Sequence, residues 1–189
     1  MKKIIARLSL NTSGWHQPSG ATGKSKNRIH EQIYGFGFEE WLFNESFTFK
    51  DKNGEIWHFG YIEGIYKNHK PSDENFTLQL FTIDARTRKR YIVAEIKEWK
   101  KLSANESTNL INQNWDLIDQ MKNDIIQLNN PEAIGKFLKH QNNENNEDNQ
   151  NTYQLFNIKF KDFSFCYDTA KPLDRTNRIY KLNRFWLHR

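Results

Sequence analysis

The chain has 189 residues, which is the length of one large domain and enough to bury a core without disulfides or metal ions. It carries 28 lysines and arginines against 23 acids, so its formal net charge is +5. This balance favours a polyanionic partner without requiring one. Cys166 is the only cysteine, which excludes an intrachain disulfide. It lies in an alternating apolar run and is interpreted as a small strand residue rather than a nucleophile.

The N-terminal segment begins with a charged stretch, but Arg7 interrupts its apolar run and no cleavage-like site follows. It is therefore not expected to be a signal peptide. No stretch approaches the roughly 20 apolar residues that a membrane span needs. We expect a cytoplasmic protein without a membrane partner.

The first half of the chain predicts short strands separated by loops. Before residue 46 the pattern indicates a strand at Ile4–Leu10 and a loop rich in Gly, Ser and Thr at Asn11–Lys26. A short helical turn at Arg28–Gly37 and one further short element at Trp41–Phe43 follow. Two hairpins follow. The first joins Ser46–Phe49 to Ile56–Tyr66 across an Asn-Gly turn, and the second joins Phe76–Asp84 to Tyr91–Trp99 across the basic turn Ala85–Arg90.

Residues 104–129 change to helical spacing, and Pro131 is expected to stop that helix and to begin a second one that runs to His140. The Asn-rich segment 141–151 cannot bury apolar surface, so it is predicted to be a disordered loop. Tyr153–Tyr167 returns to alternation. The order predicts a single α+β domain over residues 1–189, with a curved, mostly antiparallel sheet or partly closed barrel, flanking helices, and late strands that return to the first sheet.

Two segments carry the clearest functional signal: Trp15–Gly20 and Tyr34–Phe43. Both combine aromatic rings with glycine or proline, and the second adds two adjacent acids. Aromatic rings beside polar groups suit a flat ligand such as an unstacked base. Trp15 and Trp41 are candidates to stack on or line such a pocket, with a core position as the alternative for both. Ser19, Glu39 and Glu40 are candidates for contacts to a base edge, or for hydrogen bonds that shape the loops.

Two basic segments suit a phosphate backbone. The candidates in the first are Lys24, Ser25, Lys26 and Arg28, and in the second Arg86, Arg88, Lys89 and Arg90. With Asp84, the second has a local charge of +3. A solvated charged turn is the alternative. The first segment contains Gly-Lys-Ser, but Pro18 occupies the position of the first glycine of a phosphate-binding loop, and no apolar helix pattern follows. Nucleotide hydrolysis is therefore not expected.

Asp84, Glu95 and Lys97 match the short core pattern of a metal-dependent nuclease, in which two carboxylates hold a cation and the lysine assists the attacking water. A solvated strand face with alternating Glu and Lys is the simpler interpretation. The six histidines show no metal-binding spacing. We expect no cofactor and no resident metal ion.

The segment Gly14–Gly20, the segment Tyr34–Phe43 and the hairpin Leu80–Lys97 together resemble the N-terminal specificity domains of bacterial modification-dependent restriction systems. They are similar in character to the EVE, YTH and SRA domains of the PUA-like group. The resemblance covers roughly residues 1–105 and does not extend to the later helices.

The resemblance implies a curved sheet whose pocket accepts a flipped, methylated base, with basic loops that hold double-stranded DNA. It also implies a separate nuclease or GTPase effector, as another domain or subunit, rather than catalysis by this chain. No effector pattern is visible in these residues, so the chain is expected to be a fragment of a longer enzyme or an independent reader. Three alternatives stay open: the metal-dependent nuclease, an RNA-binding domain of the same group, and a protein-interaction domain with a basic surface.

Overall fold

The computed structural model describes residues 3–25, 29–68, 75–143, 154–182 and 185–188. Within these ranges, seven strands form one mixed sheet in the order β2-β3-β6-β5-β4-β1-β7. The strands are β1 (Lys3–Leu8), β2 (Thr48–Lys50), β3 (Ile56–Gly60), β4 (Thr77–Ile83), β5 (Arg90–Lys101), β6 (Ile158–Phe165) and β7 (Phe185–His188).

The predicted α+β class and the mostly antiparallel sheet are confirmed. Every pairing between the described strands is antiparallel except that of β1 with β4, which runs parallel from Lys3 opposite Thr77 to Leu8 opposite Thr82. The late strands return to the first sheet as expected, since β6 lies between β3 and β5 and β7 pairs with β1. Among the described strands, β2 and β7 are unclosed edges. The sheet is therefore open and not a closed barrel.

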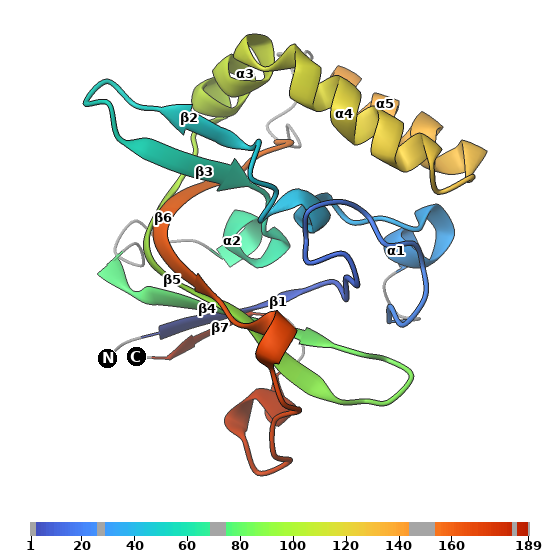
Figure 1. Ribbon diagram of the computed structural model, residues 1–189, viewed down its shortest axis with the longest axis vertical. Helices are drawn as coiled ribbons and strands as arrows, with labels where there is room; N and C mark the ends of the chain where they lie inside the picture. The colour runs from blue at the N-terminus through green and yellow to red at the C-terminus, as the bar shows by residue number, and fades with distance from the viewer. Residues whose placement is uncertain (1–2, 26–28, 69–74, 144–153, 183–184, 189) are drawn as a thin grey trace.

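The sheet is strongly curved, and two local distortions accompany the bend (Figure 1). A bulge shifts the β4–β5 register between Leu80 and Phe81. In β6, Asp162 has a left-handed backbone with φ of 48°, a conformation that Asp tolerates better than most residues. Bulges bend and twist the strands that carry them. The curved sheet half encloses a short helix, α2 (Glu63–Asn68), and the 3-10 turn η1 (Phe38–Trp41).

The remaining helices lie outside this concave face. They are α1 (Ile29–Tyr34), α3 (Ala104–Gln113), α4 (Trp115–Ile126) and α5 (Pro131–Asn143). Ser103 and Glu106 form a capping box that begins α3, because the Ser103 hydroxyl accepts from the Glu106 N–H at 3.2 Å and the Glu106 carboxylate accepts from the Ser103 N–H at 2.9 Å. Pro131 occupies the first turn of α5, as predicted.

Three expectations about these elements are wrong. The predicted helix 104–129 is two helices, because Asn114 leaves the helical region with φ of −133° and ψ of 46°. The predicted strand Ile56–Tyr66 ends at Gly60, and α2 follows. Asn157 fixes that change of direction, since its side chain accepts from the Ile62 N–H and donates to the Ile62 carbonyl, both at 2.9 Å. Residues 141–143 of the predicted disordered segment 141–151 belong to α5, and the rest lies outside the described residues.

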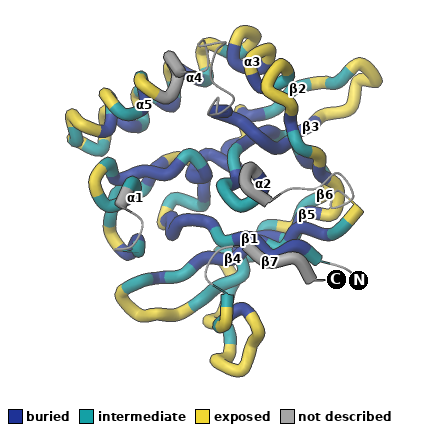
Figure 2. Tube along the Cα trace, turned by 180° about the vertical axis from the view of Figure 1, so that it is seen from behind, coloured by how far each residue is buried: buried dark blue, intermediate teal, exposed yellow. Residues whose placement is uncertain are grey.

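The core is divided into three apolar clusters. The first fills the concave face between the sheet and α2 and contains Trp15, Phe43 and Trp99. The second lies between η1, β3 and the helices α3 to α5. The third lies on the opposite face of β4, where Phe81 and Ile5 pack against Ile179. Figure 2 shows these buried segments in dark blue and the exposed loops in yellow.

Candidate functional site

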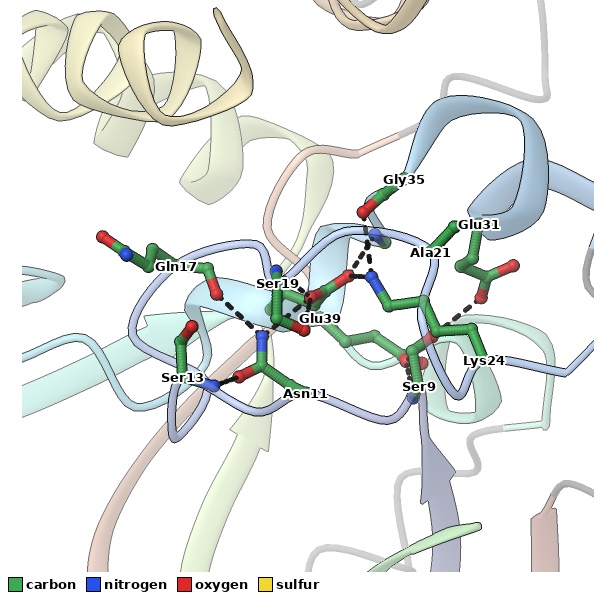
Figure 3. A network of polar contacts seen from close by, with 12 residues as sticks. Ser9, Asn11, Ser13, Gln17, Ser19, Ala21, Lys24, Glu31, Gly35 and Glu39 are labelled. Atoms are coloured by element: carbon green, nitrogen blue, oxygen red, sulfur yellow. Dashed lines mark hydrogen bonds and ion pairs between the residues drawn. The ribbon is translucent and has the colours of Figure 1, made fainter. Parts of the chain in front are cut away.

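The loop that follows β1 is held by a buried polar network, of which Figure 3 shows Asn11, Ser19 and Lys24. Glu40 lies at its centre. Oε1 of this carboxylate accepts two hydrogen bonds and Oε2 accepts three. Oε1 accepts from the Lys24 ammonium and from the Gly37 N–H at 2.8 Å. Oε2 accepts from the Asn11 amide at 2.7 Å, from the Ser19 N–H at 3.0 Å and from the Ser19 hydroxyl at 3.4 Å. The network thus ties the loop to η1 at several points along its length.

Glu40 is fully buried, and burial raises the pKa of its carboxyl, while the Lys24 ammonium and the N–H donors of Ser19 and Gly37 oppose that shift. Five hydrogen-bond donors contact the two oxygens. Such an arrangement suits an ionised carboxylate, which only accepts. Of the two roles considered for Glu40, the loop-shaping one is the role it has in this structure.

Glu39, like Glu40, is a buried carboxylate that accepts hydrogen bonds from the surrounding backbone. Its Oε2 accepts from the Ser9 N–H at 2.8 Å, and its Oε1 accepts from the Glu63 N–H at the start of α2 at 3.3 Å. The Ser9 hydroxyl also donates to Glu31 at 2.8 Å. Glu39 is 2% exposed. The two adjacent acids therefore fix the end of β1, the loop and the start of α2 around η1.

Lys24 corrects a sequence-based expectation. It was predicted to contact phosphate, but its side chain has no exposed area, and its ammonium donates to Glu40 and to the Gly35 carbonyl, the latter at 2.9 Å. In this conformation Lys24 offers no charge to an outside anion. Ser25 is half-buried at the end of the described loop, and Lys26 and Arg28, predicted to contact phosphate, lie outside the described residues.

Trp15 lies beneath a small group of aromatic side chains. Its φ is 59°, it has no exposed area, and its backbone N–H donates to the Asn11 side chain at 2.9 Å. The ring meets Tyr167 edge-on at a centroid distance of 4.9 Å, and Tyr167 in turn lies 5.9 Å from Tyr91. The buried indole N–H of Trp15 has no hydrogen-bond acceptor within the described part of the chain. Trp15 is thus a core residue whose cover consists of half-exposed rings.

Trp41 belongs to a different part of the molecule. It is 2% exposed, packs in the second cluster against Phe36, and donates its indole N–H to Asp124 of α4 at 2.8 Å. Trp15 lies in the first cluster. The expectation that Trp15 and Trp41 face one pocket is therefore wrong in this conformation: each ring supports a separate core.

The basic β4–β5 turn does present exposed cations. Arg86, Arg88 and Lys89 are exposed at its tip. Asp84 accepts from the Arg86 N–H at 2.9 Å and from its guanidinium at 3.3 Å, which shapes the turn. Arg90 differs, because its guanidinium donates to the carbonyl of Leu182 at 2.8 Å and stacks on Tyr180. Arg90 is therefore a structural clamp and not part of the exposed tip.

The loop and the hairpin tip, more than 60 positions apart in the sequence, meet in space. The Ala85 N–H donates to the Gly23 carbonyl at 2.9 Å. A Cβ on Gly23 would lie 2.5 Å from a Leu10 methyl group, 3.4 Å from the Arg86 guanidinium and 3.5 Å from the Asp84 carboxylate. Only glycine permits this approach with its φ of 78°. The end of the loop at Gly23, which directly precedes the predicted basic segment, thus lies beside the basic turn.

Sequence reasoning missed Tyr91 and Tyr167. Tyr167 follows β6 in the short 3-10 turn η3 (Tyr167–Thr169), and burial, with Tyr91 and Asp84 nearby, raises the pKa of its hydroxyl. Tyr91 is the second residue of β5 and directly follows Arg90. Both occur in alternating runs that also suit a strand, so only the packing of β5 against β6 brings them together. The available signal was the aromatic run ending at Tyr167.

The residues of the nuclease alternative do not converge. Asp84 shapes the turn, Glu95 accepts from Lys3 at 2.9 Å, and Lys97 lies 3.6 Å from Asp162. Glu95 pairs with Gln79, five residues before Asp84, so the backbone positions of the two acids are about 16 Å apart along the strand direction. Within the described residues, no three side chains of His, Cys, Asp or Glu are placed to hold a metal ion.

Comparisons with known proteins identify no relative. No protein-family model matches the chain, and neither the curated proteins nor the solved structures contain a significant match. In the described part of the chain, no helix combines the length and the apolar character that crossing a bilayer requires.

Proposed function

We propose that this chain binds double-stranded DNA and recognises a modified, methylated base, as the specificity module of a bacterial restriction or defence system. One observation carries the proposal: the hydrogen bond between Ala85 and Gly23 places the exposed cations of the β4–β5 turn beside the loop that holds Trp15. Cations contribute sequence-independent attraction to phosphate. Aromatic side chains next to them offer a surface on which an extruded base can stack.

The stacking surface in this proposal is the pair Tyr91 and Tyr167, with Trp15 beneath them. Both tyrosines are half-buried, so each ring keeps part of its surface accessible. Stacking of a base on an aromatic ring contributes about 1–3 kcal/mol per base. That is comparable to the few kcal/mol needed to extrude a base from the duplex. Asp84, which lies near Tyr167, is an acceptor suited to an amino group on the base edge.

In this proposal the chain binds DNA and catalyses no reaction. The turn cations hold the duplex, the tyrosines contact the extruded base, and the Glu40 network keeps the loop in place. A nuclease or GTPase effector, in another domain or subunit, would act on the recognised DNA. The proposal includes membership of the PUA-like group, which the sequence resemblance implies.

A binding experiment tests the proposal. The affinity of the chain is measured for methylated and unmethylated duplexes of the same sequence at one fixed salt concentration. We expect tighter binding of the methylated duplex, and a loss of that preference in Tyr167→Ala. The matched control is Trp115→Ala, which removes an aromatic side chain that is 52% exposed on α4. It should keep the preference.

The outcomes separate the alternatives. Equal affinity for both duplexes would contradict recognition of a modified base while leaving general DNA binding. Stronger competition by RNA than by DNA would favour the RNA-binding alternative. Magnesium-dependent cleavage that Lys97→Ala abolishes would favour the nuclease.

A further inference from the structure

A second basic segment packs directly against the β4–β5 hairpin. We call residues 170–182 the C-terminal arm. Its Ile179 is 3% exposed and packs with Phe81 and Ile5 on the outer face of the sheet, with Leu173 and Leu182 beside it. This apolar contact anchors the arm through one side and leaves its polar side chains outside.

Arg90 joins the hairpin to the arm. Its guanidinium donates to the carbonyls of Ile179 and Leu182, the latter at 2.8 Å, and lies 4.9 Å from the centre of the Tyr180 ring. The Leu173 N–H donates to the Arg90 carbonyl at 2.9 Å. The first residue of β5 therefore makes contacts at both ends of the arm. The position of the arm relative to the basic turn is fixed by these bonds.

The arm carries excess positive charge on its exposed side. It has four cations, Lys171, Arg175, Arg178 and Lys181, and one acid. That acid, Asp174, accepts from the N–H and the hydroxyl of Thr176, both at 2.8 Å, so it is engaged in its own turn. In the described part of the chain, no ion pair involves Lys171, Arg175 or Lys181. These three side chains are exposed, and no acid within the described ranges forms an ion pair with them.

The arm and the tip of the β4–β5 turn project from the same end of the molecule, away from α3, α4 and α5 (Figure 1). Both are exposed along most of their length (Figure 2). We propose that the C-terminal arm is a second phosphate-contacting surface, which binds the backbone of the same DNA duplex as the hairpin tip. This inference rests on the proposed function, because it assigns further contacts to the same bound duplex.

The test compares three double variants that each remove two exposed positive charges. Arg175→Gln with Lys181→Gln changes the arm, and Arg88→Gln with Lys89→Gln changes the hairpin tip. Lys50→Gln with Lys52→Gln is the control, because Lys50 ends β2 and Lys52 lies in the β2–β3 turn, at the far end of the sheet. For each, the dissociation constant for one duplex is measured over a range of salt concentrations. All six positions are exposed, so each variant is expected to fold.

Each phosphate contact contributes about 0.9 to the slope of log affinity against log salt. We expect the arm and hairpin variants each to lose nearly two units of slope, equally on methylated and unmethylated duplexes, and the control to keep the wild-type slope. Wild-type slope in the arm variant, together with a reduced slope in the hairpin variant, would overturn the inference and leave the proposed function intact. Absence of binding by the wild-type chain to any duplex would instead reject the proposed function itself.

Discussion

Lys24 and Glu40 form an ion pair in which neither side chain has any exposed area. A lysine in a loop rich in Gly, Ser and Thr would ordinarily be solvated. Here the Glu40 carboxylate, from a turn that begins 14 residues later, draws it into the interior. The pair joins the middle of the loop to η1, and it makes the loop part of the folded core.

Replacing Lys24 with Met should destabilise the protein strongly. The change leaves the Glu40 carboxylate buried without its counter-charge, and removing one partner of a buried pair costs about 3–5 kcal/mol. Urea unfolding followed by circular dichroism measures the free energy of unfolding. Lys24→Met with Glu40→Gln should be closer to wild type than Lys24→Met alone, because no uncompensated charge remains and the amide oxygen still accepts hydrogen bonds from the loop. A loss below about 1 kcal/mol in the single variant, the range of exposed pairs, would contradict the structural role of Lys24.

Replacing Trp41 with Phe should reduce stability and leave DNA affinity unchanged. The variant loses the indole bond to Asp124, whose carboxyl has its pKa raised by burial, and leaves space in the second cluster. Loss of a hydrogen bond to a charged group costs about 1.5–3 kcal/mol. Thermal unfolding and a DNA titration on the same sample provide both readouts. Unchanged stability together with weaker discrimination of the methylated base would indicate that Trp41 contacts the base and is not only a core residue.

Stability should fall as the pH drops through the histidine range. Burial lowers the pKa of His30 and of His58 from the ordinary 6.5, and for His30 the nearby Glu31 carboxylate opposes that shift. The folded state therefore binds fewer protons than the unfolded chain just below this pH. The stability due to the neutral rings is complete above 6.5 and is lost as the pH falls toward and through the folded pKa values.

The measurement is the free energy of unfolding at several pH values between about 7 and 5, a window above the range in which exposed carboxyls titrate. The variant His30→Gln with His58→Gln should show a flatter profile than the wild type. His16→Gln, at an exposed position, is the control and should retain the wild-type slope. Identical profiles for the double variant and the wild type would contradict the attribution of the pH dependence to His30 and His58.

Replacing Gly23 with Ala should disturb the contact between the loop and the hairpin. Gly20 and Gly23 share a φ of 78°, so alanine at either position incurs the left-handed penalty of about 1–2 kcal/mol. Only at Gly23 would the new Cβ also clash with Leu10, since no atom lies within 4 Å at Gly20. Gly23→Ala should therefore have the lower melting temperature and the weaker DNA affinity. Equal losses in both variants would show that strain alone matters.

The sequence predicted the strands from alternation and turn residues, and these predictions hold where local pattern decides the structure. The Asn-Gly turn produces the β2–β3 hairpin, with the Gly54 N–H donating to the Asp51 carbonyl at 2.9 Å. The parallel pairing of β1 with β4 was not predictable in this way, because more than 60 residues separate the two strands. The break at Asn114 was missed because apolar spacing continues through it.

The site was harder to predict than the fold, because several residues of types that are usually exposed and functional are buried and structural in this protein. Composition indicates a solvated cation at Lys24 and a possible base contact at Glu40, yet the two neutralise each other inside the protein. Conversely, Tyr91 and Tyr167 looked like ordinary strand residues. Their relation to Trp15 depends on the register of β5 with β6, in which Ala94 lies opposite Phe165.

The hydrogen-bond donors that hold Glu40 have a consequence for any binding event at the loop. They come from Asn11, Ser19, Lys24 and Gly37, so the loop is already ordered before a ligand arrives. Ordering flexible segments is one of the main entropic costs of association. A preorganised loop avoids that cost. The heat-capacity change on binding should then reflect only the apolar surface buried in the interface, and it should be smaller than for a loop that folds as it binds.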